Sequence, residues 1–499
     1  MTTLLTLHPN DDVAVALSDL APGDTGGDGT TIRSDVPGGH KVARRDLRAG
    51  ELVHKYGQVI GVTTTEVLAG EHVHVHNLAM PADGARSGAG TTGRAEPVDA
   101  ARRTFDGYVR ADGRTATRNF VGVLTSVNCA ATVARQVARR FEDVDLPGVD
   151  GVVALTHGSG CGMADHGPGW EILRRTLSGY ARHPNIGGVV VVGLGCEVNE
   201  LSGLVKELGV DDHVPVESFS IQDVGGTAAA VAEGERGVRA IAERIRGARR
   251  EQVGLEHLVL GLQCGGSDGW SGLSANPTLG VASDIVVRAG GTSMLGETPE
   301  IYGAEHLLAA RAVDDGVSRR LLDRIAWWER YVETQGTTLD GNPSPGNKAG
   351  GITTILEKSL GAVAKAGNSP LSEVVEYGQR PTRVGLVFMD TPGFDPVSVT
   401  GMVAGGANVI AFTTGRGSVF GSKPVPTVKL ASNSAMAARM SDDIDVDCGP
   451  VVSAGVSLRE MGATVLDTIL DVASGRRSAS ESLGLGGEEM VPWQMGAVL

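Results

Sequence analysis

Residues 189–200 read VVVVGLGCEVNE, an uninterrupted apolar run that ends in a polar segment containing glycine. A short apolar run rich in β-branched residues and bounded by glycine is typical of a strand buried on both faces of a parallel sheet. Four further runs have the same design, at residues 151–155, 258–262, 384–389 and 409–412. The segments that end the five runs are LGCEVNE, THGSGCG, QCGGSDG, DTPGFDP and TTGRGS. Because open α/β sheets bind ligands outside the carboxyl ends of their strands, these segments predict one shared site.

The apolar runs alternate with helix-like stretches throughout residues 102–499, with helices expected at 131–141, 228–246 and 305–332. This alternation predicts a large parallel-sheet α/β catalytic domain, which could divide into two subdomains. Residues 81–101 are rich in Gly, Ala, Ser, Thr and Pro, so we expect a linker there. Residues 1–80 hold short β-like runs between glycine-containing turns, which predicts a small β-rich domain.

Composition limits the class of protein. The chain has 499 residues, 72 of them Gly, without a G-X-Y period and with 41% hydrophobic residues, which excludes collagen-like and disordered chains. A formal charge of −15 without a basic run argues against nucleic acid or an anionic membrane as a partner. TTGRGS lacks the spacing of a P-loop, and no serine stands in GxSxG, which disfavours nucleotide binding and serine-hydrolase chemistry. The N-terminus lacks a signal-peptide pattern and the five cysteines include no CxxC pair, so we expect a cytoplasmic protein with free thiols.

Histidines are concentrated in EHVHVHN, residues 71–77. On a strand, His72, His74 and His76 would point to one face, and His40 begins another β-like run that could lie beside them. Gathered imidazoles suit a transition metal such as Fe²⁺ or Zn²⁺ better than Mg²⁺ or Ca²⁺. These four histidines are one predicted metal site, and His40 and His74 are also candidate catalytic residues. The alternative is an exposed strand with a solvated polar face.

Three cysteines form a second candidate metal site. Cys161, Cys196 and Cys264 each follow an apolar run by a few residues, and parallel strands could bring them to one sheet edge. Thiolates there could bind iron, or one could be activated by a helix N-terminus. Alternatively, each cysteine fills space in the core. Glu297 and Glu300 carry further acid or base potential.

Polar residues near the strand ends supply other candidate groups. His157, Glu197 and Lys348 are candidate catalytic residues, and Pro and Gly predict an extended loop around Lys348 in NPSPGNKAGG. Arg118 and Arg416 can each bind a carboxylate through two hydrogen bonds. The predicted substrate-binding residues are Arg118, Asn119, Ser267, Asp268, Asp390, Thr391, Thr413, Thr414 and Arg416.

Over nearly its whole length the sequence resembles the altronate/galactarate dehydratase family of sugar-acid dehydratases. HPNDDVAVAL, GHKVA, KYGQVIGVTT and EHVHVHN resemble the N-terminal SAF domain of that family. In the large domain the resemblance rests on TFDGYVRADGRTATRN, HGSGCG, GLGCE, CGGSDGWSGLSANP, ETPEIYGAEHLL, NPSPGNKAGGITTILEKSLGA, MDTPGFDPVS and FTTGRGS. FMDTPGFDPVS, TTGRGSVFG and VPWQMGAVL resemble altronate dehydratases more closely than galactarate dehydratases. The resemblance implies a requirement for Fe²⁺, or another divalent metal, and for reducing conditions.

The resemblance also implies a hydro-lyase that converts D-altronate to 2-keto-3-deoxy-D-gluconate and water. In such a reaction a base removes the C2 proton, an acid protonates the departing C3 hydroxyl, and a metal stabilises the enediolate. We expect the histidine-rich domain to lie over the sheet edge of the large domain. The alternatives are a galactarate dehydratase, a sulfo-lyase acting on a sulfonated hydroxy acid, and a non-catalytic sugar-acid sensor. The expected partners are a small anionic sugar acid and, through a contact at Trp327 and Trp328, a second copy of the chain.

Overall fold

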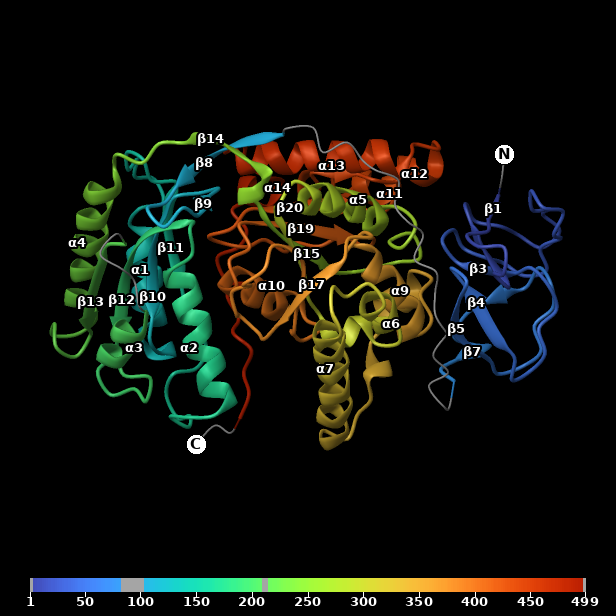
Figure 1. The fold of residues 1–499 in the computed structure, drawn as a ribbon, viewed down its shortest axis with the longest axis horizontal. Helices are drawn as coiled ribbons and strands as arrows, with labels where there is room; N and C mark the ends of the chain where they lie inside the picture. The colour runs from blue at the N-terminus through green and yellow to red at the C-terminus, as the bar shows by residue number, and fades with distance from the viewer. Residues whose placement is uncertain (1–2, 82–102, 209–213, 497–499) are drawn as a thin grey trace.

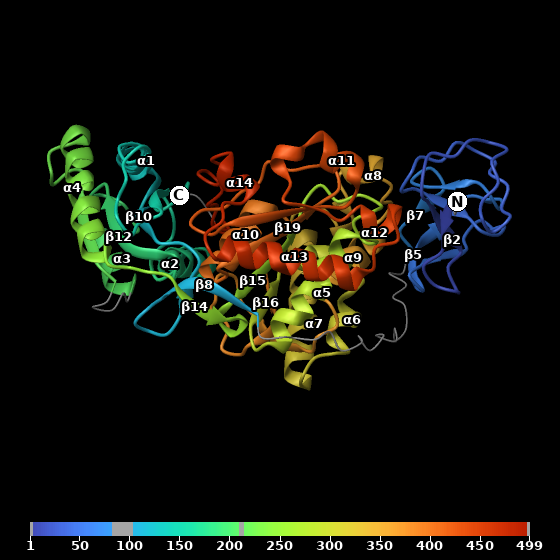
Figure 2. The same ribbon diagram turned by 90° about the horizontal axis from the view of Figure 1, so that it is seen from above.

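The computed structural model describes residues 3–81, 103–208 and 214–496. Three regions follow one another along the longest axis, as Figures 1 and 2 show. A β-rich N-terminal domain lies at one end, a four-stranded sheet lies at the other, and a seven-stranded sheet lies between them. The predicted linker, residues 81–101, lies outside the described residues except for residue 81.

The N-terminal domain consists of short antiparallel strands in two sheets, with the orders β1-β2-β3-β6 and β4-β5-β7. Their bounds are β1 Leu4–Leu5, β2 Val13–Ala16, β3 Lys41–Ala43, β4 Leu52–Lys55, β5 Gln58–Thr63, β6 His72–Val73 and β7 Leu78–Ala79. Apolar side chains such as Val53, Ile60 and Val73 are fully buried in this domain. The predicted small β-rich domain is thus confirmed.

The four-stranded sheet is parallel, with the order β11-β10-β12-β13. Its strands are β10 Phe120–Thr125, β11 Gly151–Leu155, β12 Ile186–Gly193 and β13 Val216–Ser220, and its helices are α1 Ala131–Arg139, α2 Pro168–Ala181, α3 Leu201–Leu208 and α4 Thr227–Ile245. Helices α1 and α4 pack on one face, whereas α2 and α3 pack on the other. A β-ribbon of β8 Thr104–Val109, β9 Thr115–Ala116 and β14 Glu251–Gly254 lies beside this sheet.

The seven-stranded sheet is also parallel, with the order β17-β18-β16-β15-β19-β20-β21. Its strands are β15 Val259–Cys264, β16 Thr292–Leu295, β17 Leu371–Val375, β18 Gly385–Met389, β19 Val409–Thr414, β20 Thr427–Ala431 and β21 Val446–Asp447. The α-helices of this region are α5 Ala275–Arg288, α6 Glu305–Ala309, α7 Asp315–Thr334, α8 Pro345–Ala349, α9 Ile355–Ala364, α10 Asp395–Ala404, α11 Ser434–Arg439, α12 Pro450–Ser453, α13 Leu458–Ala473 and α14 Ala479–Ser482. Helices α5, α7 and α13 cover one face, and α10 packs between the other face and α2. The contact between α10 and α2 joins the cores of the two sheets.

The five apolar runs all form strands, but in two different sheets. Runs 151–155 and 189–193 lie in β11 and β12, whereas the other three lie in β15, β18 and β19. The α/β class is confirmed, but the prediction that all five following segments share one sheet edge is wrong. The helix expected at 305–332 is interrupted between α6 and α7. None of the helices in the described ranges is long and apolar enough to cross a membrane.

Candidate active site

Three histidines of the N-terminal domain come together at β3 and β6. The antiparallel pairing of these strands sets Val42 opposite His72, which places His40, just before β3, next to His72. Nδ1 of His40 and Nε2 of His72 lie 3.0 Å apart and share a hydrogen bond. The ring of His74 stacks on that of His72 at a centroid distance of 5.2 Å and lies 4.9 Å from that of His40. We call His40, His72 and His74 the histidine cluster.

His76 lies beside the cluster rather than in it. Strand β6 is shorter than expected because it ends at Val73, after which the chain turns. The exposed ring of His76 has its centroid 5.4 Å from that of His72. Within the described residues, the histidine cluster is the only group of three imidazoles whose ligand nitrogens all lie within 4.8 Å of one another.

The protonation state of the histidine cluster suits a metal ion. Burial, followed by the charges of neighbouring groups, lowers the pKa of His72 to about 3 and that of His74 to about 4. Burial also lowers the pKa of His40. Neutral imidazoles have a lone pair to donate, and Nδ1 of His74 is buried without a hydrogen bond to any described residue. The cluster therefore fits Fe²⁺ or Zn²⁺.

The histidine cluster is docked against two turns of the large domain. The amide of Gly269 donates to the carbonyl of Gly350 at 2.7 Å, which joins the QCGGSDG loop after β15 to the turn after α8. A Cβ atom at Gly269 would collide with the carbonyl of Gly39, and one at Gly351 would lie 3.2 Å from the ring of His40. Glycine is needed at both positions because the backbones of the two domains approach so closely.

A buried ion triad fixes this contact between the domains. Nζ of Lys41 and Nζ of Lys55 each lie 2.8 Å from a carboxylate oxygen of Glu357 on α9. Burial alone would raise the pKa of Glu357, but Lys41 and Lys55 outweigh it and hold that pKa far below its usual value. The triad therefore carries charge at neutral pH, and its three members come from both domains.

Two strand-end loops of the seven-stranded sheet lie side by side next to this contact. The amides of residues 415 and 416 in TTGRGS donate to the carbonyl of residue 266 in QCGGSDG. Asp268 is buried and accepts hydrogen bonds from Ser271 at 2.8 Å and Ser432 at 2.9 Å. The two loops thus bring together the predicted substrate residues Ser267, Asp268, Thr413, Thr414 and Arg416. Of these five residues, Arg416 is exposed.

Asp390 and Thr391 have a different role from the predicted one. Oδ1 of Asp390 accepts from the indole of Trp328 at 2.8 Å and from Thr298 at 2.6 Å. Oγ1 of Thr391 accepts the amide of Glu297 at 2.7 Å. Both residues are buried and hold the loop after β16 in place, so we correct their assignment from substrate binding to support of that loop.

A second group of reactive side chains is buried at the same sheet edge. Nζ of Lys365 lies 2.7 Å from Sγ of Cys264 and 3.7 Å from Glu297, and Nζ of Lys358 lies 2.7 Å from Glu300. Both lysines were missed from the sequence, although their spacing of seven residues puts two cations on one face of an apolar helix. We call these five residues the buried acid–base group.

The two glutamates of the buried acid–base group have opposite protonation preferences. Burial, followed by the charge of Glu300, raises the pKa of Glu297 well above its usual value, and both of its carboxylate oxygens lack hydrogen bonds within the described part of the chain. Burial would also raise the pKa of Glu300, but Lys358 and Lys365 lower it below the usual value. Two carboxylates driven apart in this way are typical of an acid–base pair.

A cavity of about 20 Å³ lies between the triad and the buried acid–base group. Lys55, Cys264, Asp268, Glu357 and Lys358 are among its lining residues. This volume holds about one water molecule and no sugar acid. A substrate must therefore open the contact between the domains, or bind outside it beside the histidine cluster.

The predicted catalytic residues His157 and Glu197 follow β11 and β12. These strands belong to the four-stranded sheet, which lies at the other end of the molecule from the N-terminal domain (Figure 1). Burial lowers the pKa of His157 to about 4, and its ring bonds the carbonyl of Thr125 at 3.0 Å. Glu197 accepts from Ser126 at 2.6 Å and supports its own loop. The structure does not bring either residue to the histidine cluster.

The predicted three-cysteine metal site is not formed. Cys161 and Cys196 are exposed at the four-stranded sheet, whereas Cys264 is buried at the end of β15 in the other sheet. Cys264 instead has ligand atoms of Glu297 and Glu300 within 4.8 Å. The prediction placed the strands before these three cysteines in one sheet because their local patterns are the same. It is wrong because β11 and β12 belong to the four-stranded sheet and β15 to the seven-stranded sheet.

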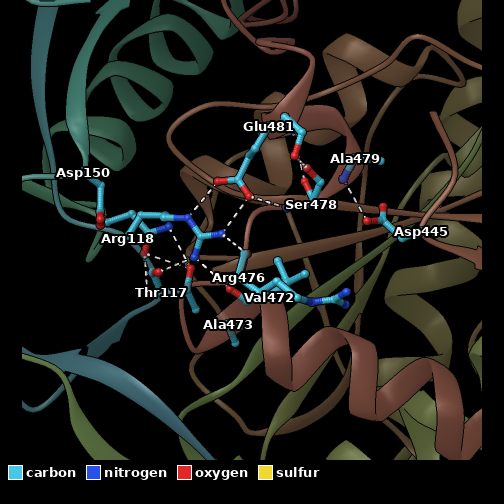
Figure 3. A network of polar contacts seen from close by, with 12 residues as sticks. Thr117, Arg118, Asp150, Asp445, Val472, Ala473, Arg476, Ser478, Ala479 and Glu481 are labelled. Carbon is cyan, nitrogen blue, oxygen red and sulfur yellow. Dashed lines mark hydrogen bonds and ion pairs between the residues drawn. The ribbon is translucent and has the colours of Figure 1, made fainter. Parts of the chain in front are cut away.

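Arg118 is a structural residue, contrary to its predicted role in substrate binding (Figure 3). Its guanidinium donates to both carboxylate oxygens of Glu481 at 2.7 Å. Its remaining donors go to backbone carbonyls of Thr117, Val472 and Arg476. All five N–H groups are used, which leaves none for a substrate.

Asn119 also lies away from the site. It precedes β10, at the amino end of a parallel strand rather than at the carboxyl end. Its side chain accepts from Arg110 at 2.8 Å and donates to the carbonyl of Gly148 at 2.5 Å. Its predicted contact with substrate is therefore not supported by its position.

Lys348 lies close to the histidine cluster, although its local structure differs from the prediction. The expected extended loop is the short helix α8, capped by Ser344, whose side chain accepts the amide of Asn347. The side chain of Asn347 donates to the carbonyl of Ser267 at 2.8 Å, which fixes α8 to the QCGGSDG loop. The backbone of Ala349 in turn bonds the ring of His40.

Three families match consecutive parts of the chain. Residues 2–81 match "Altronate/galactarate dehydratase SAF domain", residues 107–246 match "D-galactarate dehydratase/Altronate hydrolase, second domain", and residues 255–498 match "D-galactarate/Altronate dehydratase, C-terminal". Altronate dehydratase of Escherichia coli K12 is 38% identical over 95% of this chain and 96% of its own length. Altronate dehydratase of Bacillus subtilis 168 is 36% identical over 95% and 96% of the two chains. Galactarate dehydratase (L-threo-forming) of Escherichia coli K12 is 38% identical over 96% and 94%.

Proposed function

Because the chain belongs to the altronate/galactarate dehydratase family, a family of carbon–oxygen lyases, we propose that it dehydrates D-altronate to 2-keto-3-deoxy-D-gluconate. The observation that carries this proposal is the histidine cluster, three neutral imidazoles docked on the strand-end loops of the seven-stranded sheet. Galactarate is the second candidate substrate, since a galactarate dehydratase is as similar in sequence as an altronate dehydratase.

We propose that the histidine cluster holds Fe²⁺. Such an ion would bind the substrate carboxylate and stabilise the negative charge that develops as the C2 proton leaves. The alternative set, Cys264, Glu297 and Glu300, suits a cation less well, because burial raises the pKa of Cys264 to about 12 and the ammonium of Lys365 lies 2.7 Å from its sulfur. Among the residues that the structure describes, no lysine or arginine side chain forms a hydrogen bond with the histidine cluster.

Proton transfer needs groups outside the metal ligands. His76 is exposed next to His72, so we assign it removal of the C2 proton. Lys348 lies on α8, adjacent to the backbone that bonds His40, and we assign it protonation of the departing C3 hydroxyl. The exposed Arg416 would bind the carboxylate of the sugar acid, while Asp268 and Thr413, whose side chains bond Ser432 and Asn276, hold the loops around it.

The first experiment measures keto acid, trapped with semicarbazide, from D-altronate and galactarate under anaerobic conditions with Fe²⁺. His74→Ala should lose bound iron and turnover, whereas His54→Ala, which removes a histidine paired with Asp12 outside the cluster, should keep both. If the iron-loaded protein forms keto acid from neither D-altronate nor galactarate, the proposed activity is contradicted. Full turnover by His74→Ala would refute the role of the cluster.

The two proton-transfer roles can be separated by isotope exchange. In D₂O, His76→Gln should lose both product formation and exchange of the C2 proton. Lys348→Met should lose product formation but retain C2 exchange, because only the later step lacks its acid. Retained exchange in His76→Gln would show that another group is the base.

We also propose a cytoplasmic location. All five cysteines are unpaired, which suits a reducing compartment and ferrous iron. A homodimer stays a prediction, and Trp327 and Trp328, which suggested it, give it no support. Trp327 stacks on Tyr331 at 4.8 Å and Trp328 stacks on Trp493 at 5.3 Å, so both rings have partners within the same chain.

A further inference from the structure

A cavity of about 710 Å³ lies at the edge of the two sheets opposite to the candidate active site. Its lining includes residues 186–187 at the start of β12, Val214 before β13, residues 378–380 before β18 and residues 405–406 before β19. These positions are at the amino ends of the strands, whereas the loops near the histidine cluster follow the carboxyl ends of β15 and β19. The volume is in the range of small-molecule sites. The fold thus provides a second binding volume that the proposed dehydration does not use.

Among the described residues, the charged side chains that line this cavity are almost all positive. One carboxylate, that of Asp112, accompanies six arginines, Arg110, Arg114, Arg175, Arg182, Arg244 and Arg380. The arginines come from four segments that are distant in sequence: the turn between β8 and β9, helix α2 with the residue that ends it, helix α4, and the connection from β17 to β18. Because the whole chain has a formal charge of −15, this concentration of positive charge does not follow from composition.

Within the part of the chain that the structure describes, five of these six guanidinium groups have no carboxylate partner. Nε of Arg110 donates to the carbonyl of Pro184 at 2.7 Å, and Nη1 of Arg175 donates to that of Tyr377 at 3.0 Å. Of the six, Arg114 alone pairs with a carboxylate among the residues that the structure describes. Burial lowers the pKa of Arg110 to about 10; the charge of Arg114 acts in the same direction, and Tyr108, Asp112 and Asp150 act against it. These contacts to backbone carbonyls hold Arg110 and Arg175 in place without compensating their positive charge.

We propose that this cavity binds a small polyanion carrying phosphate or carboxylate groups, at a site separate from the candidate active site. Guanidinium groups bind both kinds of oxyanion through paired hydrogen bonds. Because the arginines come from segments around both sheets, the bound anion also bridges the two halves of the large region. The site would respond to a metabolite other than the sugar acid that is dehydrated.

Isothermal titration of the full-length protein with inorganic pyrophosphate and, separately, with citrate tests the proposal. We expect saturable binding of at least one probe, and the probe that binds identifies the phosphate or carboxylate class. Arg380→Ala and Arg244→Ala, which truncate exposed side chains, should each weaken binding about tenfold or more. Arg236→Ala is the matched control, because Arg236 lies on α4 with Arg244 but pairs with Glu233 outside the cavity.

Three results would overturn the proposal. One is the absence of saturable heat with either probe. Another is an unchanged Kd in both Arg380→Ala and Arg244→Ala. The third is loss of binding in His74→Ala, which would place the anion at the histidine cluster rather than in the cavity.

Discussion

Replacing Glu357 by Gln should weaken the docking of the N-terminal domain on the large domain. The carboxylate lies 2.8 Å from Nζ of Lys41 and 2.8 Å from Nζ of Lys55, and none of the three side chains is more than 2% exposed. Glutamine keeps the shape but loses the charge, and its amide N–H₂ group would face an ammonium. Removing one partner of a buried ion pair costs about 3–5 kcal/mol, because the remaining charge is left uncompensated. Two ammonium groups depend on this carboxylate, so we expect about 4 kcal/mol.

Hydrogen exchange measures this loss where it occurs. If the amides of β3 exchange by opening of the domain contact, about 4 kcal/mol corresponds to exchange faster by roughly three orders of magnitude, while the amides of β10 stay unchanged. Glu243→Gln, which removes an exposed partner of Arg246, is the control and should change stability by less than about 0.5 kcal/mol. The combined change Lys41→Met, Lys55→Met and Glu357→Leu should recover slow exchange, because no buried charge remains. Exchange of β3 in Glu357→Gln within threefold of the unmodified protein would refute the reasoning.

Three further predictions follow from buried contacts. Arg118→Met should lower the free energy of unfolding by about 3 kcal/mol, which a lower Tm would show, and should leave KM for the sugar acid unchanged within about twofold. A higher KM at an unchanged Tm would instead support the predicted role of Arg118 in substrate binding. Burial lowers the pKa of His183 to about 3, so between pH 6.5 and pH 5 the unfolded chain takes up about half a proton at this residue that the folded chain does not, and the free energy of unfolding falls by about 1.7 kcal/mol. Urea unfolding at both pH values should show a smaller loss for His183→Gln, and an equal loss would exclude this residue as the cause. Gly415→Ala should reduce turnover, because its Cβ would collide with the carboxylate of Asp268, whereas Gly487→Ala, with open space around it, should have no effect.

Local patterns predicted the strands well and their grouping poorly. Runs 151–155 and 258–262 have the same apolar composition and the same kind of following loop, so nothing local separates them. Their assignment to different sheets depends on which helices pack between them, and α10 against α2 is a contact between segments more than 200 residues apart. The histidine cluster was predictable in part because two of its three members, His72 and His74, stand two residues apart, and the sequence predicts His40 on a neighbouring β-like run.

The role of Arg118 shows why other site residues could not be predicted. An arginine between polar residues can bind a substrate or a distant part of the same chain, and its partner Glu481 is 363 residues away in the sequence. Lys358 on α9 and Lys365 at its C-terminal end show the opposite error. Both were overlooked beside apolar residues, although a buried cation needs a partner. In both cases the deciding information is a tertiary contact.

Glu297 is held in a left-handed backbone conformation, with φ 67° and ψ 65°. Among the natural amino acids glycine adopts this conformation without strain, and other residues do so at a cost of about 1–2 kcal/mol. Position 297 can therefore carry a carboxylate with a strained backbone, or a glycine with an unstrained backbone, but not a carboxylate with an unstrained backbone. Glycine at position 297 would relieve this strain, but it would also remove one carboxylate of the buried acid–base group. The strained backbone is therefore tied to the presence of a carboxylate at this point of the candidate active site.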